Sequence, residues 1–295
     1  MKDPFKAFTD EFSKQGQTSL PEHQVKESKI VALDDERDFF DLLPSVLEME
    51  ELAGFHPLFA ECALAMTLIM PLSYIALTMP GFRKHRKMID QAEAKYNPED
   101  PLTPVFEAYF TMWSLFDVEV EKTGKVLADV VRPLKTSLKI DDDKIDLIER
   151  MKMSYTGVYL CEEKLEESFK LKEIPSERSI EAILEPGWDK EIEKGDILLI
   201  RLIEDILEGT YIQLSSPYVV KSTEKDWIEF FVEHRIGEGE LFDFEAYRTF
   251  MKKGMSSDFW LNYIDSACLS VNDMGVTLEG TPLLPAKGLK NAKRS

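Results

Sequence analysis

The sequence predicts an α+β protein with an N-terminal helical domain, a small antiparallel β-sheet or barrel-like module, and C-terminal helices. Apolar residues recur every three to four positions up to about Met153, which is the period of amphipathic helices. The period falls to two near Ser154 and becomes helical again from Thr223. The predicted segments are a flexible N-terminal arm (1–28), a helical domain (29–153), a β-module (154–222), C-terminal helices (223–272) and a flexible tail (273–295).

The N-terminal arm contains one helical pattern. Phe5, Phe8 and Phe12 have the i, i+3, i+7 spacing of an amphipathic helix, which we expect to pack as an arm rather than anchor in a membrane. The first 15 residues carry acids and lack an apolar core, so they are unlike a secretory signal.

An uncharged run from Cys62 to Phe82 is the most distinctive segment of the helical domain, and it has two interpretations. Its length suits a membrane span of about 20 residues, followed by a basic cluster at 83–87. The less apolar residues Thr67, Pro71, Tyr74 and Thr78 instead form one helical stripe, which favours a core helix with one face near water. Pro71 also allows two shorter helices in place of one.

Further helices are predicted on both sides of the break at 97–101. A charged helix covers 84–96, and Thr103 with Pro104 is expected to begin the next one. Two amphipathic helices follow at 123–138 and 141–153, the second starting with three aspartates that favour a helix N-terminus.

Five short strands are predicted in the β-module, joined by tight turns rich in Gly and charged residues, and they favour a small antiparallel sheet or partly closed barrel. Their ranges are 156–161, 168–174, 179–184, 197–204 and 210–214. After them, Thr223 and Asp226 resemble a capping box, and Gly254 is expected to end a later helix.

The charge of the chain limits its partners. With 55 acidic and 36 basic Lys and Arg residues, the net charge of −19 argues against bulk binding to nucleic acid or anionic lipid. Three widely spaced cysteines without a CxxC pair favour a reducing compartment, so we expect a cytoplasmic protein. We expect a protein partner and no cofactor, and the oligomeric state stays open.

Common catalytic and cofactor motifs are absent. The four histidines lack the HExxH, ExxH and HxE spacings, and the chain has no GxGxxG, P-loop or GxSxG pattern. His56, Glu61 and Cys62 are close enough in sequence to be metal ligands. The alternative is a histidine at a helix entry, before Pro57, with a carboxylate near the helix start.

Two pairs of residues are catalytic candidates. Glu162 and Lys164 end a predicted strand with an acid-x-Lys pattern, as in nucleases where carboxylates hold magnesium and lysine orients water. A hairpin turn explains the same residues. Asp117 and Glu119 follow an aromatic helix and could serve acid–base chemistry, or form a solvated helix end.

Two short motifs carry a resemblance to a known group of proteins. They are Trp113-Ser114-Leu115-Phe116-Asp117 and Gly195-Asp196 before the strand that bears Arg201. The region 104–220 is similar to a segment of uncharacterised bacterial proteins that often end in a SEC-C zinc motif. The resemblance implies a soluble bacterial protein in which a helix pair precedes a small β-module. The cysteine-rich zinc segment is missing here, so zinc-dependent docking is not implied.

The sequence therefore favours a non-catalytic binding or interaction protein. Arg201, Tyr211 and Tyr218 are the expected contact residues, because exposed aromatics with an arginine commonly anchor interfaces. The alternative for both tyrosines is a half-buried strand position. Two other functions remain open: a metal-dependent hydrolase or nuclease using Glu162 and Lys164, and a single-pass membrane protein anchored by 62–82.

Overall fold

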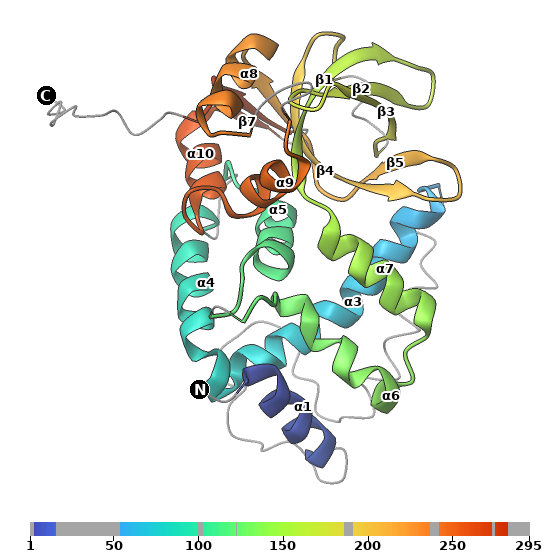
Figure 1. Cartoon of the computed structure of the whole chain (residues 1–295), viewed down its shortest axis with the longest axis vertical. Helices are drawn as coiled ribbons and strands as arrows, with labels where there is room; N and C mark the ends of the chain where they lie inside the picture. Colours follow the sequence, from blue (N-terminus) through green and yellow to red (C-terminus); the bar gives the residue numbers. More distant parts are fainter. Residues whose placement is uncertain are drawn as a thin grey trace, which may run out of the picture. The chain divides into compact units, whose positions relative to one another are not determined.

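The computed structural model has the predicted α+β fold (Figure 1). Along the chain, helices come first, a β-barrel follows, and further helices come after it. It describes residues 3–15, 54–98, 103–121, 123–185, 191–236, 242–272 and 275–282. Two compact units are present: Met1–Gln91 with Thr111–Ser154, and Ala92–Phe110 with Tyr155–Ser295. A helix with Phe39 and Phe40 on its buried face was also expected after Asp34, and it lies outside the described residues.

The first unit is helical. Its elements, two of which continue into the second unit, are α1 (Pro4–Gln15), α3 (Pro57–Thr78), the 3₁₀ helix η2 (Pro80–Phe82), α4 (Arg83–Tyr96), α5 (Glu107–Met112), the π-helix η3 (Trp113–Asp117), the 3₁₀ helices η4 (Leu127–Val130) and η5 (Arg132–Leu134), α6 (Lys135–Leu138) and α7 (Asp142–Met153). The single helix expected over 123–138 is wrong. Pro133 lacks the N–H that an α-helical ladder needs there, and short 3₁₀ turns replace it.

Helix α1 is packed into the first unit rather than free. Phe5 and Phe8 are each 1% exposed, and the Phe5 ring meets the Phe82 ring edge-on at 5.2 Å. Gly81 allows this approach, because a Cβ at that position would lie 2.9 Å from the Cβ of Pro4. The prediction of a packing helix is confirmed, and the expected flexibility of the arm is wrong for residues 4–12.

Helix α3 runs without a break through Pro71, so two separate helices are not formed. Its buried residues recur with helical spacing, and they include Leu58, Cys62, Ala65, Ile69, Leu72 and Ala76. The predicted polar stripe reaches water, since Tyr74 is 46% exposed. By length and composition α3 is also able to cross a membrane, with a mean hydropathy of 1.7 over 18 residues, but core helices pass the same test.

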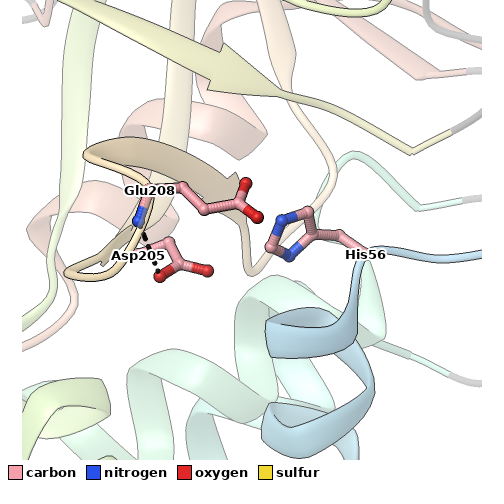
Figure 2. A group of neighbouring side chains, drawn as sticks. All are labelled: His56, Asp205 and Glu208. Carbon is pink, nitrogen blue, oxygen red and sulfur yellow. Dashed lines mark hydrogen bonds between the residues drawn. The ribbon is translucent and has the colours of Figure 1, made fainter.

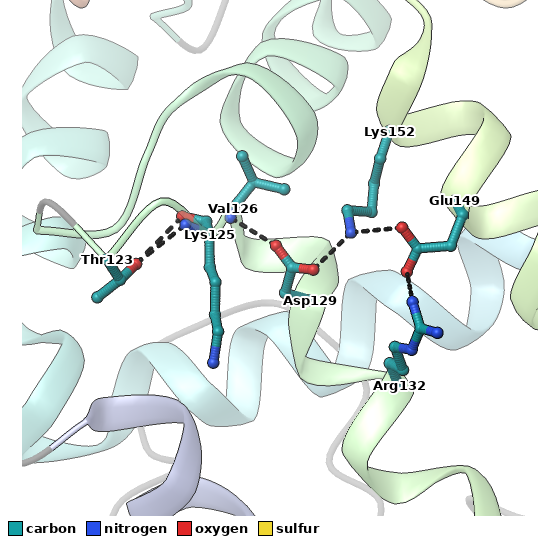
Figure 3. Close-up of polar contacts among 7 residues, drawn as sticks. All are labelled: Thr123, Lys125, Val126, Asp129, Arg132, Glu149 and Lys152. Carbon is teal, nitrogen blue, oxygen red and sulfur yellow. Dashed lines mark hydrogen bonds and ion pairs between the residues drawn. The ribbon is translucent and has the colours of Figure 1, made fainter.

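Polar contacts join the segments that pack around α3, which touches both η4 and α7. The Asp129 carboxylate of η4 accepts the Val126 N–H at 2.8 Å and receives Lys152 of α7 at 2.5 Å (Figure 3). Lys152 also binds Glu149 at 2.8 Å, and Glu149 binds Arg132 at 3.2 Å (Figure 3). Burial opposes the charge of Lys152, but the two acids outweigh it and raise the pKa of this lysine.

The second unit is built on a closed five-stranded barrel (Figure 1). Its strands are β1 (Thr156–Lys164), β2 (Phe169–Glu173), β3 (Arg178–Ile183), β4 (Ile197–Asp205) and β5 (Thr210–Gln213). They pair in the order β1-β2-β3-β5-β4, and β4 returns to β1. All five predicted strands are confirmed.

One strand pair of the barrel departs from the antiparallel pattern that was expected of a small sheet. Strands β3 and β5 pair in parallel, with Ala182 opposite Tyr211. A closed ring of five strands cannot alternate direction throughout, so at least one neighbouring pair must be parallel. Periodicity identifies strands but carries no information on their direction or order.

Three further strands extend the sheet beyond β4, and apart from the strand position considered for Tyr218 they were not predicted from the sequence. They are β6 (Tyr218–Lys221), β7 (Cys268–Asn272) and β8 (Gly275–Glu279), and β8 pairs in parallel with β6. The expected flexible tail from 273 is therefore wrong for residues 275–279, because pairing with β6 fixes them in the sheet.

Three C-terminal helices form within the predicted segment 223–272, but the expected helix is wrong for residues 268–272, which form strand β7. The helices are α8 (Glu224–Glu233), α9 (Phe244–Lys253) and α10 (Phe259–Ala267). The Thr223–Asp226 capping box begins α8, and Gly254 ends α9. The Tyr247 hydroxyl of α9 accepts the Val158 N–H of β1 at 3.1 Å, and this bond ties the helix to the barrel.

Side chains fill the barrel. Alternate residues of its strands contribute to one buried cluster, and the members that lie on strands include Tyr159, Phe169, Leu171, Ile180, Leu198, Ile200 and Leu202. A packed interior of this kind leaves recognition to the outer face, the mouths and the loops.

Candidate functional site

The β4–β5 hairpin carries the most exposed large apolar residues of the described chain. Ile206 is 67% exposed and Leu207 is 96% exposed. Acidic residues surround them in sequence, namely Glu204, Asp205 and Glu208. We call residues 204–208 the hairpin tip. Single exposed apolar residues are common, but two adjacent ones at a turn within an acidic segment are a candidate contact site.

The hairpin tip has a defined backbone conformation. The Asp205 carboxylate accepts the Leu207 N–H at 2.9 Å and the Glu208 N–H at 3.4 Å (Figure 2). The Gly209 N–H also donates to the Asp205 carbonyl at 2.7 Å, and Gly209 has φ +73°, which favours glycine. Because Asp205 holds the turn, the backbone that carries the two apolar side chains has little conformational freedom left to lose on binding.

A polar network closes the barrel mouth next to the hairpin tip. Glu173 ends β2 and is fully buried, and its carboxylate accepts the Tyr155 hydroxyl at 2.6 Å and the Ser176 hydroxyl at 2.7 Å. Arg178 lies 3.6 Å from the same carboxylate and donates to the Tyr211 hydroxyl at 3.1 Å. These five residues form the mouth network.

Arg178 and Tyr211 are the members of the mouth network that reach the surface. The Arg178 side chain is 42% exposed, and its guanidinium lies 5.3 Å from the centre of the Tyr211 ring. Burial opposes the charge of Arg178, but Glu173 and the nearby tyrosines outweigh it and raise its pKa. Tyr211 stands opposite Glu204 in the β4–β5 ladder, so this pair adjoins the hairpin tip.

The tyrosines of the mouth network stay neutral. Burial, followed by the Glu173 carboxylate, raises the pKa of Tyr155. Burial also raises the pKa of Tyr211, and Glu204 adds to the effect. Neutral phenols can donate hydrogen bonds to Glu173 but are poor bases, so the network suits structural positioning rather than proton transfer.

The expected contact residues are only partly on the surface. Arg201 and Tyr218 are both fully buried, so the prediction that they are exposed anchors is wrong. The Tyr218 hydroxyl accepts the Phe106 N–H at 3.3 Å, and burial raises the pKa of this tyrosine. Tyr211 is half-buried, and its arginine partner is Arg178. Arg178 was not predicted as a contact residue, because it stands just after a turn and no apolar pattern marks it.

The expected nuclease residues do not form a site in the described chain. Glu162 accepts the Ser179 hydroxyl at 3.0 Å and pairs with Lys170 at 3.8 Å. Neither Glu162 nor Lys164 belongs to a group of acids or histidines whose ligand atoms converge. The hairpin interpretation fits these contacts, since both residues lie where β1 runs on toward β2.

Asp117 and Glu119 have different surroundings. Asp117 ends the π-helix η3 and is 8% exposed, whereas Glu119 starts a short bridge to Val126. The Glu119 carboxylate accepts the Gly124 N–H at 2.5 Å, so it closes the loop between them. The carboxylate pair expected for acid–base chemistry is therefore not supported.

The three residues proposed as metal ligands also separate. His56 precedes the first turn of α3 (Figure 2) and is its N-cap. Its Nδ1 accepts the Leu58 N–H at 3.2 Å, and Pro57 takes the first helical position. Cys62 is 2% exposed, and burial raises the pKa of its thiol to about 12, while Glu61 is exposed. In the described chain these three do not make a converging ligand group, and the helix-entry interpretation is confirmed.

Polar side chains on and beside β2, within the described residues, are paired with acids. Five-stranded barrels that bind single strands use cationic and aromatic side chains on their second and third strands. Here Lys172 of β2 pairs with Glu224 at 2.5 Å, Lys170 pairs with Glu162, and Ser168 donates to Glu181 of β3. The lysines of β2 are therefore neutralised by acids of the same unit.

Comparison of the chain with protein-family models, with curated proteins and with solved structures found no match in any of the three. The candidate site therefore stands on its geometry alone.

Proposed function

We propose that this protein is a non-catalytic binding protein that contacts another protein through the hairpin tip of its β-barrel. The observation that carries the proposal is the exposure of Ile206 and Leu207, 67% and 96%, on a turn held by Asp205. Exposed aliphatic residues on a preorganised turn lose water on binding and lose little conformational entropy.

The neighbouring mouth network supports the same role. Tyr and Arg side chains are enriched among the residues that dominate interface energies, and Arg178 with Tyr211 offers both beside the hairpin tip. The buried Glu173 carboxylate lies 3.6 Å from the Arg178 guanidinium, so Arg178 and Tyr211 are ordered before a partner binds. The filled barrel interior, in contrast, offers the described part of the chain no room for a small ligand.

We also propose that the protein acts in the cytoplasm, with α3 as the core helix of its first unit. Support comes from the helical stripe that α3 buries and from its contacts with η4 and α7. We also propose the resemblance of 104–220 to bacterial proteins that often end in a SEC-C motif, because α7 leads directly into a small β-module, although short 3₁₀ turns replace the first helix of the expected pair.

The test compares two double variants of the whole chain in affinity capture with quantitative mass spectrometry. The tip variant is Ile206→Ser with Leu207→Ser. The control variant is Val232→Ser with Met255→Ser, which removes two other exposed apolar side chains, 49% and 51% exposed, elsewhere in the same unit. Surface changes of this kind alter stability by about 0.5 kcal/mol or less, so all proteins should unfold at similar temperatures.

We expect proteins captured by the wild type to be retained by the control variant and lost by the tip variant. Burying an Ile and a Leu contributes about 3 kcal/mol or more, so the affinity should fall at least roughly a hundredfold. Equal capture by all three proteins would rule out the hairpin tip as the contact site.

A further inference from the structure

From the charges around the hairpin tip we infer the chemistry of its partner: an apolar pocket edged by Lys and Arg side chains. This inference rests on the proposed function and adds the class of surface that the tip enters. Leu207 is the residue that we place in the pocket, because it is 96% exposed.

The charge of the tip is one-sided. Glu204, Asp205 and Glu208 lie within two residues of Ile206 or Leu207, and the segment 202–209 contains no Lys or Arg. Counted over this segment, the formal charge is negative, and Arg178 of β3 lies against Glu173 and Tyr211 beside it. A partner therefore meets apolar side chains with a negative rim, which complements a positive rim.

The same charges disfavour the other possible occupants. Two copies joined through their tips would bring six carboxylates together, and each chain carries a net charge of −19. An anionic lipid surface would repel the tip in the same way. A basic protein surface would bind favourably through both the apolar and the acidic residues of the tip. We therefore infer that the partner is such a surface.

The fixed backbone of the turn is the second reason to expect that Leu207 enters a defined pocket of the partner. Asp205 accepts two backbone N–H groups of the turn, at 2.9 Å and 3.4 Å, so Leu207 projects from a fixed backbone. A rigid apolar side chain rimmed by charge matches the usual anatomy of an interface, with an apolar centre and a polar rim.

The experiment uses a photo-reactive benzoylphenylalanine placed at position 207 of the whole chain, with the same probe at position 232 as the control. Irradiation is carried out in lysate of the native host at about 50, 150 and 400 mM salt. The Debye screening length is about 8 Å at the middle concentration, longer at the lowest and shorter at the highest. A second protein carries Glu204→Gln and Glu208→Gln beside the probe at 207. Asp205 is kept, because it holds the turn.

We expect a protein adduct at 207 that is absent at 232, that weakens as salt rises, and that falls about threefold to tenfold with the two Gln substitutions. Mass spectrometry should place the cross-link in a segment with Lys or Arg next to apolar residues. An adduct insensitive to salt and to both substitutions would overturn the inference but keep the proposed function. An adduct with a second copy or with lipid overturns the inference, and no adduct above the 232 control overturns both.

Discussion

His85 gives the most direct test of the physical argument, because a titratable side chain is buried in an apolar position of α4. It follows the buried Phe82 by three residues and precedes the buried Ile89 by four, so all three share one helix face. His85 is 3% exposed, and its Nε2 has no hydrogen-bond partner in the described structure. Burial lowers its pKa from 6.5 to about 4.

The sign of the pH effect follows from linkage. The unfolded chain takes up the proton near pH 6.5 while folded His85 stays neutral down to about pH 4. Acidification through this range therefore favours unfolding, and the effect levels off below the folded pKa. The loss should be about 2 kcal/mol between pH 7 and 5, and about 3 kcal/mol by pH 4.

His85→Leu should remove this dependence, since leucine does not titrate and leaves no unsatisfied nitrogen in the core. We expect the variant to match or exceed wild-type stability at pH 7 and to exceed it by about 2 kcal/mol more at pH 5. Urea unfolding followed by pulsed hydrogen exchange of the 83–96 peptides reports this helix separately from the barrel. Lys87→Gln, an exposed change on the same helix, is the control.

The reasoning would be refuted if the stability difference between wild type and His85→Leu were the same at pH 7 and pH 5. Such a result would mean that His85 is hydrated or protonated in the folded state. Differences between the proteins isolate this residue, because carboxylates that titrate in the same range contribute to both equally.

Three other predictions concern packing. Gly81→Ala should loosen α1, because the new methyl would lie 2.9 Å from the Cβ of Pro4. We expect faster hydrogen exchange in residues 4–12 and a free energy of unfolding lowered by about 1–2 kcal/mol, and unchanged exchange would contradict the close contact. Glu173→Ala should lower the free energy of unfolding by about 3 kcal/mol in urea, because it leaves the buried Tyr155 hydroxyl and Arg178 without this carboxylate. A decrease below about 1 kcal/mol would contradict the role given to the mouth network. Thiol labelling at pH 8 should modify the partly exposed Cys268 in the folded protein. Cys62, whose pKa burial raises to about 12, should react only on unfolding, and labelling of Cys62 before unfolding would show that α3 is not packed as described.

Local chemistry in the sequence determined the strands of the barrel and the starts of several helices. The change of period near Ser154 marked five strands that the structure confirms, and the capping box at Thr223 and the histidine before Pro57 marked helix starts that it also confirms. These signals work because helix capping and side-chain alternation depend on residues a few positions apart.

Tertiary structure alone decided how these elements meet. The parallel pairing of β3 with β5 and the capture of β8 by β6 join segments distant in sequence, and no local period encodes them. The candidate site shows the same limit, because Arg178 became the partner of Tyr211 through pairing of their strands, while Arg201 was buried. Periodicity states which residues can share a face, but only the closed barrel decides which faces are covered and which reach water.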